Sequence, residues 1–148
     1  MKILAVGKTD EKFAGILANY EKRLPHSWRI DWQIVSYSRK NGEESRREES
    51  AKLREKISPD DFVILLDERG RELSSPEFSR KIENVIAVKD LVFVLGGAYG
   101  VTDEFRENCD LVLSFSRMVF PHQIARLVLV EQIYRAFAIS RNLPYHHV

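Results

Sequence analysis

The sequence predicts an α/β layered fold, with helices on both sides of a parallel sheet. Short apolar runs alternate with helical patterns along all 148 residues, in a strand–helix order that repeats to the end of the chain. Residues 62–67, 91–95 and 111–115 are apolar at nearly every position, which is typical of parallel strands covered on both faces. No linker, internal repeat or low-complexity segment interrupts the pattern, so we expect one domain over residues 1–148.

The first part of the chain contributes two further strands and a helix. Residues 2–7 predict a buried strand, and residues 10–24 carry apolar side chains at helical spacing. Residues 28–36 alternate apolar and polar side chains, which favours a strand with one covered face that includes Ile34. Residues 41–57 are dense in Glu, Arg and Lys, and form either a solvated helix or a loop that is mobile until a ligand binds.

Three helices are expected in the second part. Residues 75–88 form one, with Pro76 in its first turn, and residues 102–108 form a shorter one that Thr102 caps. The last helix begins at Pro121 and is apolar on nearly every side. Such a helix must be covered on more than one face, and in a chain of this length we expect a second subunit to supply that cover.

Composition and charge limit the function classes. With 44% hydrophobic and 30% charged residues, the chain has the composition of an ordinary globular domain. The formal charge of +1 excludes a strong overall attraction to nucleic acid but leaves room for a local basic face. The single Cys109 excludes an intrachain disulfide, and we expect it to be a packing residue. Neither a signal peptide nor a membrane span is apparent, so a cytoplasmic protein is expected.

Ligands of open α/β sheets bind beyond the carboxyl ends of the strands, and three unusual loops follow strands here. They are residues 68–70, the Gly-Gly-Ala-Tyr-Gly run at 96–100 and residues 114–122. Gly96 and Gly97 allow a close approach of backbone to a ligand, although a plain turn is an equally open interpretation. The run matches neither a dinucleotide fingerprint nor a phosphate loop. Beside an apolar, aromatic loop, it suits a flat-ringed ligand of low charge, such as adenosine linked to a thioether or sulfonium.

Titratable residues in these loops leave several roles open. Asp67 and Glu68 suit a general base or an attraction for a sulfonium, but ordinary turn acids account for them at least as well. His122 either starts the last helix or lines the ligand loop. The adjacent His146 and His147 point to opposite faces of an extended chain, and no Cys or carboxylate cluster joins them, so no metal site is expected.

The motifs LLDERG, FVLGGAYG, LSFSRMVFPHQIARLVLVEQIYRAF and the terminal PYHH resemble those of the SPOUT methyltransferases. The chain is most similar to the small single-domain branch that methylates N3 of a pseudouridine in large-subunit ribosomal RNA. The resemblance extends over the whole chain, from MKILAVGK onward. It implies a C-terminal trefoil knot, whose loops bind S-adenosyl-L-methionine as the methyl donor, and it implies a homodimer.

The resemblance also assigns roles to individual residues. Tyr145 and His146 would contact the acceptor nucleotide, with His146 as a possible base, although a purely structural tail is equally open. Val148, where relatives commonly end in a charged residue, is a departure from the family pattern. The implied donor-binding residues are Leu66, Gly96, Gly97, Phe115, Ser116, Arg117, Met118, Val119 and Phe120.

Arginines near these motifs suggest how RNA would be bound. Arg117, Arg126 and Arg135 are candidates for phosphate or base contacts, but Arg135 is better explained by a pair with Glu131 four residues earlier. Because the net charge is close to zero, we expect an assembled ribosome or subunit as the partner rather than free RNA.

Two other functions compete with this interpretation. A catalytically silent ribosome-binding or assembly protein would share the scaffold and differ only in donor binding and turnover. A nucleotide-dependent oxidoreductase is disfavoured, because the segment after the first strand lacks the glycine fingerprint.

Overall fold

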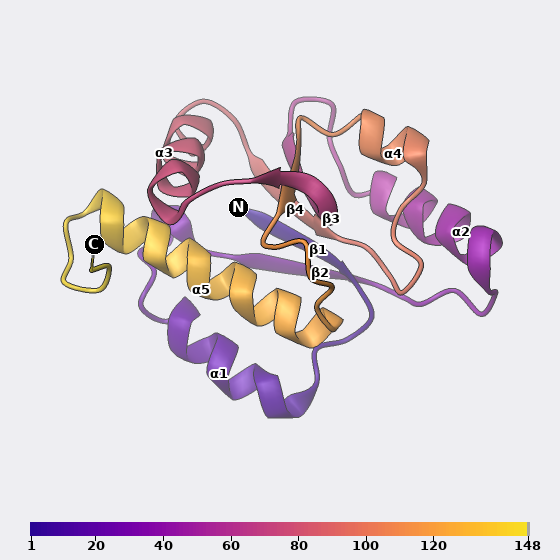
Figure 1. Cartoon of the computed structure of the whole chain (residues 1–148), viewed down its shortest axis with the longest axis horizontal. Coiled ribbons are helices and arrows are strands. Elements are labelled where there is room, and N and C mark those ends of the chain that lie inside the picture. Colours follow the sequence, from indigo (N-terminus) through magenta and orange to yellow (C-terminus); the bar gives the residue numbers. More distant parts are fainter. Residues whose placement is uncertain (148) are drawn as a thin grey trace.

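The computed structural model describes residues 1–147, and strands and α-helices alternate throughout this range, as the sequence predicts (Figure 1). A short 3₁₀ turn, His26–Trp28, precedes the second strand. The elements are β1 (Lys2–Val6), α1 (Glu11–Glu21), β2 (Asp31–Val35), α2 (Gly42–Arg54), β3 (Phe62–Glu72), α3 (Ser75–Ile86), β4 (Leu91–Leu95), α4 (Asp103–Glu107), β5 (Leu111–Ser114) and α5 (His122–Ser140).

The five strands form one parallel sheet in the order β2-β1-β4-β3-β5. Helices α1, α3 and α5 cover one face, and α2 and α4 cover the other (Figure 1). Successive side chains of a strand point to opposite faces, so β4 sends Phe93 into the core under α3 and α5 and Val94 into the core under α2 and α4. The predicted three-layer fold is confirmed, and continuous apolar strands are its direct consequence.

The structure corrects two predictions for the first part of the chain. Ile34 is 38% exposed, although Trp32, two residues earlier on the same face of β2, packs against the core. Of the two alternatives for residues 41–57, the helix is confirmed, over Gly42–Arg54, but it is not wholly solvated. One side of α2 is buried through Ser45, Glu49, Ser50 and Leu53, which follow helical spacing.

Strand β3 extends beyond its predicted end at Asp67. Its register with β5 shifts so that Leu113 pairs with both Leu66 and Arg71. Between those pairs Gly70 lies directly against the β5 backbone, where an added Cβ would be 2.7 Å from the main-chain atoms of Val112 and Leu113. Only glycine permits so close a contact between two chain segments. The trefoil knot that the resemblance implies stays a prediction.

Helix α5 has no fully exposed residue between His122 and Ser140. It packs on the sheet and is flanked by α1 and α3 of the same chain (Figure 1). These neighbours account for much of its all-round apolar character, so that the second cover need not come from another subunit. The homodimer stays a prediction. Within residues 1–147 no helix combines the length and apolarity that a membrane crossing requires.

Candidate functional site

A cavity of about 650 Å³ lies at the carboxyl ends of β3, β4 and β5. A volume of this size suits a nucleoside-sized ligand. Every predicted donor-binding residue lines it except Arg117, which is exposed beside it. The wall consists of residues 65–69, 95–101, Leu113, Phe115, Ser116, 118–122 and Ala125. The structure thus brings together three loops that the sequence places far apart.

The glycine loop, residues 96–100, forms one wall of this cavity. Gly97 and Gly100 pair across a tight turn, in which Gly100 N donates a 2.8 Å hydrogen bond to Gly97 O. Gly100 has a φ of +73°, which glycine adopts without strain. A Cβ on Gly96 would lie 3.2 Å from the Gly100 carbonyl carbon, so the two backbone segments pack directly on each other. The shape of the glycine loop therefore depends on direct contact between its own backbone segments.

The loop between β5 and α5 forms the facing wall, and its two serines order it. Ser116 N donates to Ser114 Oγ at 3.1 Å, and Met118 N donates to Ser116 Oγ at 3.0 Å. Beyond them Met118 and Val119 are 73% and 78% exposed. Apolar side chains this exposed at the mouth of a cavity are expected to be covered by a ligand or another chain.

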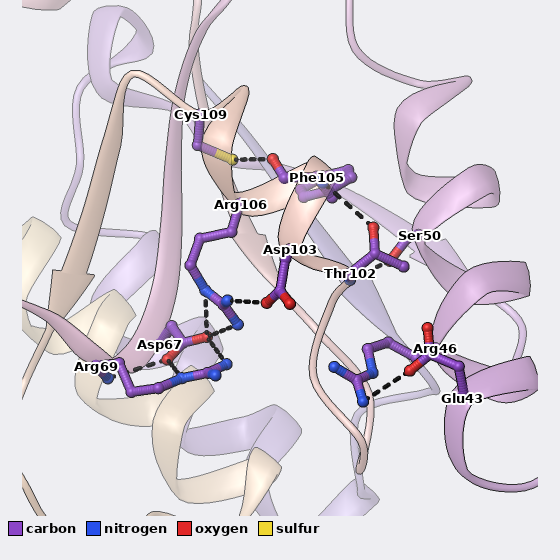
Figure 2. Close-up of polar contacts among 10 residues, drawn as sticks. All are labelled: Glu43, Arg46, Ser50, Asp67, Arg69, Thr102, Asp103, Phe105, Arg106 and Cys109. Atoms are coloured by element: carbon purple, nitrogen blue, oxygen red, sulfur yellow. Dashed lines mark hydrogen bonds and ion pairs between the residues drawn. The ribbon is translucent and has the colours of Figure 1, made fainter.

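Asp67 lies in the cavity wall but is held by two arginines (Figure 2). Arg69 Nη2 and Arg106 Nη2 each donate to Asp67 Oδ2 at 3.0 Å, and Arg106 also pairs with Asp103 at 2.6 Å. The hydrogen bond to Asp67 raises the pKa of the Arg69 guanidinium above its ordinary value. This geometry favours a structural role for Asp67 over a general base. Arg106 comes from α4, 39 residues away along the chain, and no sequence signal linked the two.

His122 starts α5 and lines the cavity. Burial lowers the pKa of its imidazole, and the nearby charge of Arg126 lowers it further, while Glu49 acts in the opposite direction. The neutral ring is therefore the dominant form at neutral pH.

The prediction that Arg126 binds RNA is wrong. Its side chain is 1% exposed and donates to the carbonyl oxygens of Val6 and Gly7 and to Thr9 Oγ1, the last at 3.0 Å. Arg126 therefore ties α5 to the end of β1. It occupies the same buried side of α5 as Leu129 and Val130, and this position in the helical repeat is the signal that marks it as internal.

The tail residues Tyr145 and His146 lie apart from the cavity, at the opposite end of α5. Tyr145 Oη donates a 2.9 Å hydrogen bond to Glu131 Oε1, and His146 Nδ1 lies 3.3 Å from Arg135 Nη1. Neither residue lines the cavity, and Glu131 stands nine residues after His122 in α5, a rise of about 14 Å along the helix axis.

Arg135 holds this end of α5 together. It donates to Glu131 Oε1 at 2.6 Å, which confirms the predicted pair, and its guanidinium lies over the Tyr145 ring at 4.8 Å. Val148 is outside the described residues. Among residues 1–147 no group of three or more His, Cys, Asp or Glu side chains is arranged to hold a metal ion.

Comparison with known proteins places these features in a family. The profile described as "Predicted SPOUT methyltransferase" matches residues 1–146. Proteins named "Ribosomal RNA large subunit methyltransferase H" are similar over nearly their whole length. The one from Geobacter sulfurreducens is 42% identical, with 99% of each chain covered. The one from Carboxydothermus hydrogenoformans is 41% identical, with 97% of each covered.

A solved structure supports the fold. It is described as "The structure of a probable methylase family protein from Haemophilus influenzae Rd KW20". The match has a TM-score of 0.55 at 18% identity and covers 95% of this chain and 66% of that one. Together with the profile match over residues 1–146, the parallel sheet and the cavity walled by strand-end loops, these comparisons show that the chain belongs to the SPOUT methyltransferase family.

Proposed function

We propose that this protein uses S-adenosyl-L-methionine to methylate N3 of a pseudouridine in large-subunit ribosomal RNA. The observation that carries the proposal is the cavity beyond β3, β4 and β5, whose glycine and apolar loops suit a flat, weakly charged ligand. The family and the printed names of its relatives supply the reaction and the class of substrate.

The donor would lie between the two facing loops of the cavity. Leu66, Gly96 and Gly97 would provide one side, where small residues let backbone groups reach the ligand. The segment from Phe115 through Ser116, Arg117, Met118 and Val119 to Phe120 would provide the other, with Arg117 reaching the donor from its exposed position beside the cavity. Closing Met118 and Val119 over a bound donor would also remove apolar surface from water.

Methyl transfer from a sulfonium is a displacement that depends on alignment. Holding donor and acceptor in line contributes about 7–11 kcal/mol when the geometry is favourable. The acceptor N3 must also lose its proton, and a base in hydrogen-bond reach accelerates such a step by about 10²–10⁴-fold. We assign the acceptor contact to Tyr145 and His146, with His146 as the base.

A second copy of the chain would bring the tail to a donor cavity. Because Tyr145 and His146 lie at the far end of α5 from their own cavity, we propose a homodimer in which the tail of one protomer completes the cavity of the other. Glu131 and Arg135 would then fix the tail in the orientation that the partner's cavity requires.

The substrate would be an assembled ribosome or large subunit, reached in the cytoplasm. A single domain with a net charge of +1 has little sequence-independent attraction for free RNA, so shape and the joint surface of two protomers must supply recognition.

Methyl transfer itself is the test. Ribosomes, free large subunits and protein-free ribosomal RNA from cells lacking the modification are incubated with methyl-labelled donor, and digested nucleosides are analysed by mass spectrometry. We expect N3-methylpseudouridine from ribosomes or subunits, little from free RNA, and a loss of about 10²-fold or more with His146→Ala. Donor binding without any label in RNA would instead favour a silent ribosome-binding protein. Preferential labelling of free RNA would overturn the proposed substrate.

A further inference from the structure

Two consecutive residues of α2 contact both ends of the segment that carries the glycine loop. The carboxyl group of Glu49 occupies the space beside the Gly97 Cα atom, where a Cβ would collide with Glu49 Oε2 and lie 3.0 Å from its Cδ. At the other end Ser50 Oγ accepts a 3.0 Å hydrogen bond from Thr102 N (Figure 2). Helix α2 therefore holds this segment where it leaves β4 and where it enters α4.

The burial of Glu49 is not explained by folding alone. Its side chain is 3% exposed, and Oε1 accepts a 2.9 Å hydrogen bond from Ser38 N. Oε2 has no hydrogen-bond partner among residues 1–147. A buried carboxyl oxygen without a partner lowers stability, so a glutamate at this position calls for a reason other than the stability of the fold.

We propose that Glu49 is a positioning residue for the methyl-donor cavity. Its carboxyl group fixes Gly97, and with it the glycine loop, against the segment around Ser38 that follows β2. Glu49 does not line the cavity and contacts its wall through Gly97, which does line it. Without the carboxyl group, the glycine loop has a gap on the side away from the cavity. Donor binding must then also order this loop, which is already ordered in the wild type, and this cost weakens the affinity. This inference rests on the proposed donor site.

Donor affinity tests the role directly. In calorimetric titrations with S-adenosyl-L-methionine, Glu49→Ala is expected to weaken binding about tenfold, a coupling typical of residues in contact. Glu49→Gln keeps the shape and the Ser38 contact, and is expected to stay within about threefold of the wild type. Glu48→Ala is the matched control, because Glu48 bonds to Ser38 Oγ and Lys52 without contacting the glycine loop. In methyl transfer, Glu49→Ala should raise the KM for the donor and leave that for the ribosome unchanged.

A double-mutant cycle separates positioning from a general loss of stability. Gly97→Ala should weaken donor binding and lower the melting temperature, because the new Cβ meets the Glu49 carboxyl group. Adding Glu49→Ala should recover part of both losses, whereas adding Glu48→Ala should recover neither.

The outcomes are distinguishable. The role of Glu49 would be overturned if the wild type binds the donor and Glu49→Ala binds it equally well. Strictly additive effects in the double-mutant cycle would also overturn it. Either result would leave the proposed function intact. Absence of donor binding by the wild type would overturn the proposed function and this inference together. Melting temperatures would then still report whether Glu49 and Gly97 are in contact.

Discussion

His122 gives the cavity a pH-sensitive side chain. Its pKa is lowered in the folded chain, first by burial and then by Arg126, whereas an unfolded histidine titrates near about 6.5. As the pH falls below that value, the unfolded chain takes up a proton before the folded chain does. The contribution of His122 therefore lowers stability as the pH falls from about 6.5 toward the folded pKa, and is constant above that range.

Replacing His122 should remove this contribution. We expect the free energy of unfolding of His122→Asn to fall less between pH 7.5 and 5.5 than that of the wild type, as measured by urea denaturation at each pH. His26→Asn is the matched control, since His26 lies exposed in the turn before β2. Equal pH dependence in the wild type and His122→Asn would show that burial of this imidazole has no energetic consequence.

Among single residues, the sequence identifies those whose own type is unusual. A glycine pair after a strand and a run of apolar and aromatic loop residues stand out, and Gly96, Gly97 and Phe115 do line the cavity. The residues that support the cavity wall without lining it cannot be recognised from their type in this way. Glu49 and Arg106 are charged residues on helices with many charges, and only the folded arrangement brings them to Gly97 and Asp67.

At the scale of elements, the end of α5 decides where the tail lies. Asn142 takes a left-handed φ of +53°, and Leu143 N returns to Ala138 O with a 2.8 Å hydrogen bond. This is the C-terminal cap that turns a chain back along its helix. The cap directs the tail to Glu131. There the Tyr145 hydroxyl stays protonated and donates a hydrogen bond, because burial raises its pKa.

Changing the cap should affect both stability and turnover. Asn142→Ala is expected to lower the free energy of unfolding by about 1 kcal/mol, since alanine lacks the polar side chain that lets asparagine adopt the left-handed conformation, while Asn142→Gly should match or exceed the wild type. Chemical denaturation measures the change. If the tail acts on the acceptor, methyl transfer should fall with Asn142→Ala and be retained with Asn142→Gly. Identical stability of the alanine and glycine variants would contradict the cap.

The predicted elements are correct where a continuous apolar run or a start signal in the sequence defines them. Continuous apolar runs indicated β4 and β5, Pro76 indicated the start of α3, and Thr102 indicated the start of α4; the observed caps are Ser74 and Thr102. The extension of β3 to Glu72 was missed, because residues 67–72 are polar or glycine, and Arg71 and Glu72 pair through their backbone with Leu113 and Ser114 of a strand much later in the chain. Backbone pairing of this kind leaves no side-chain pattern.

At the scale of the whole molecule, two separate regions carry the proposed chemistry. The cavity lies at the start of α5, whereas the Tyr145–His146 tail turns back from the end of the helix and contacts Glu131 and Arg135, without lining the cavity. A symmetric dimer in which these helices pair antiparallel would bring each tail to the other protomer's cavity and would cover the exposed Met118 and Val119. Neither the dimer nor the knot can be read from periodicity, because both depend on contacts between segments that have no common pattern.

The most direct test of the central claim is a calorimetric titration of the wild-type protein with S-adenosyl-L-methionine. Gly96→Arg, which fills the cavity, and Val88→Arg, which places the same charge on an exposed site after α3, serve as the blocked and matched variants. We predict saturable binding by the wild type and Val88→Arg, and none by a folded Gly96→Arg. Binding that survives in Gly96→Arg would place the donor elsewhere. No binding by the wild type, alone or with ribosomes present, would contradict the assignment of this cavity to the methyl donor.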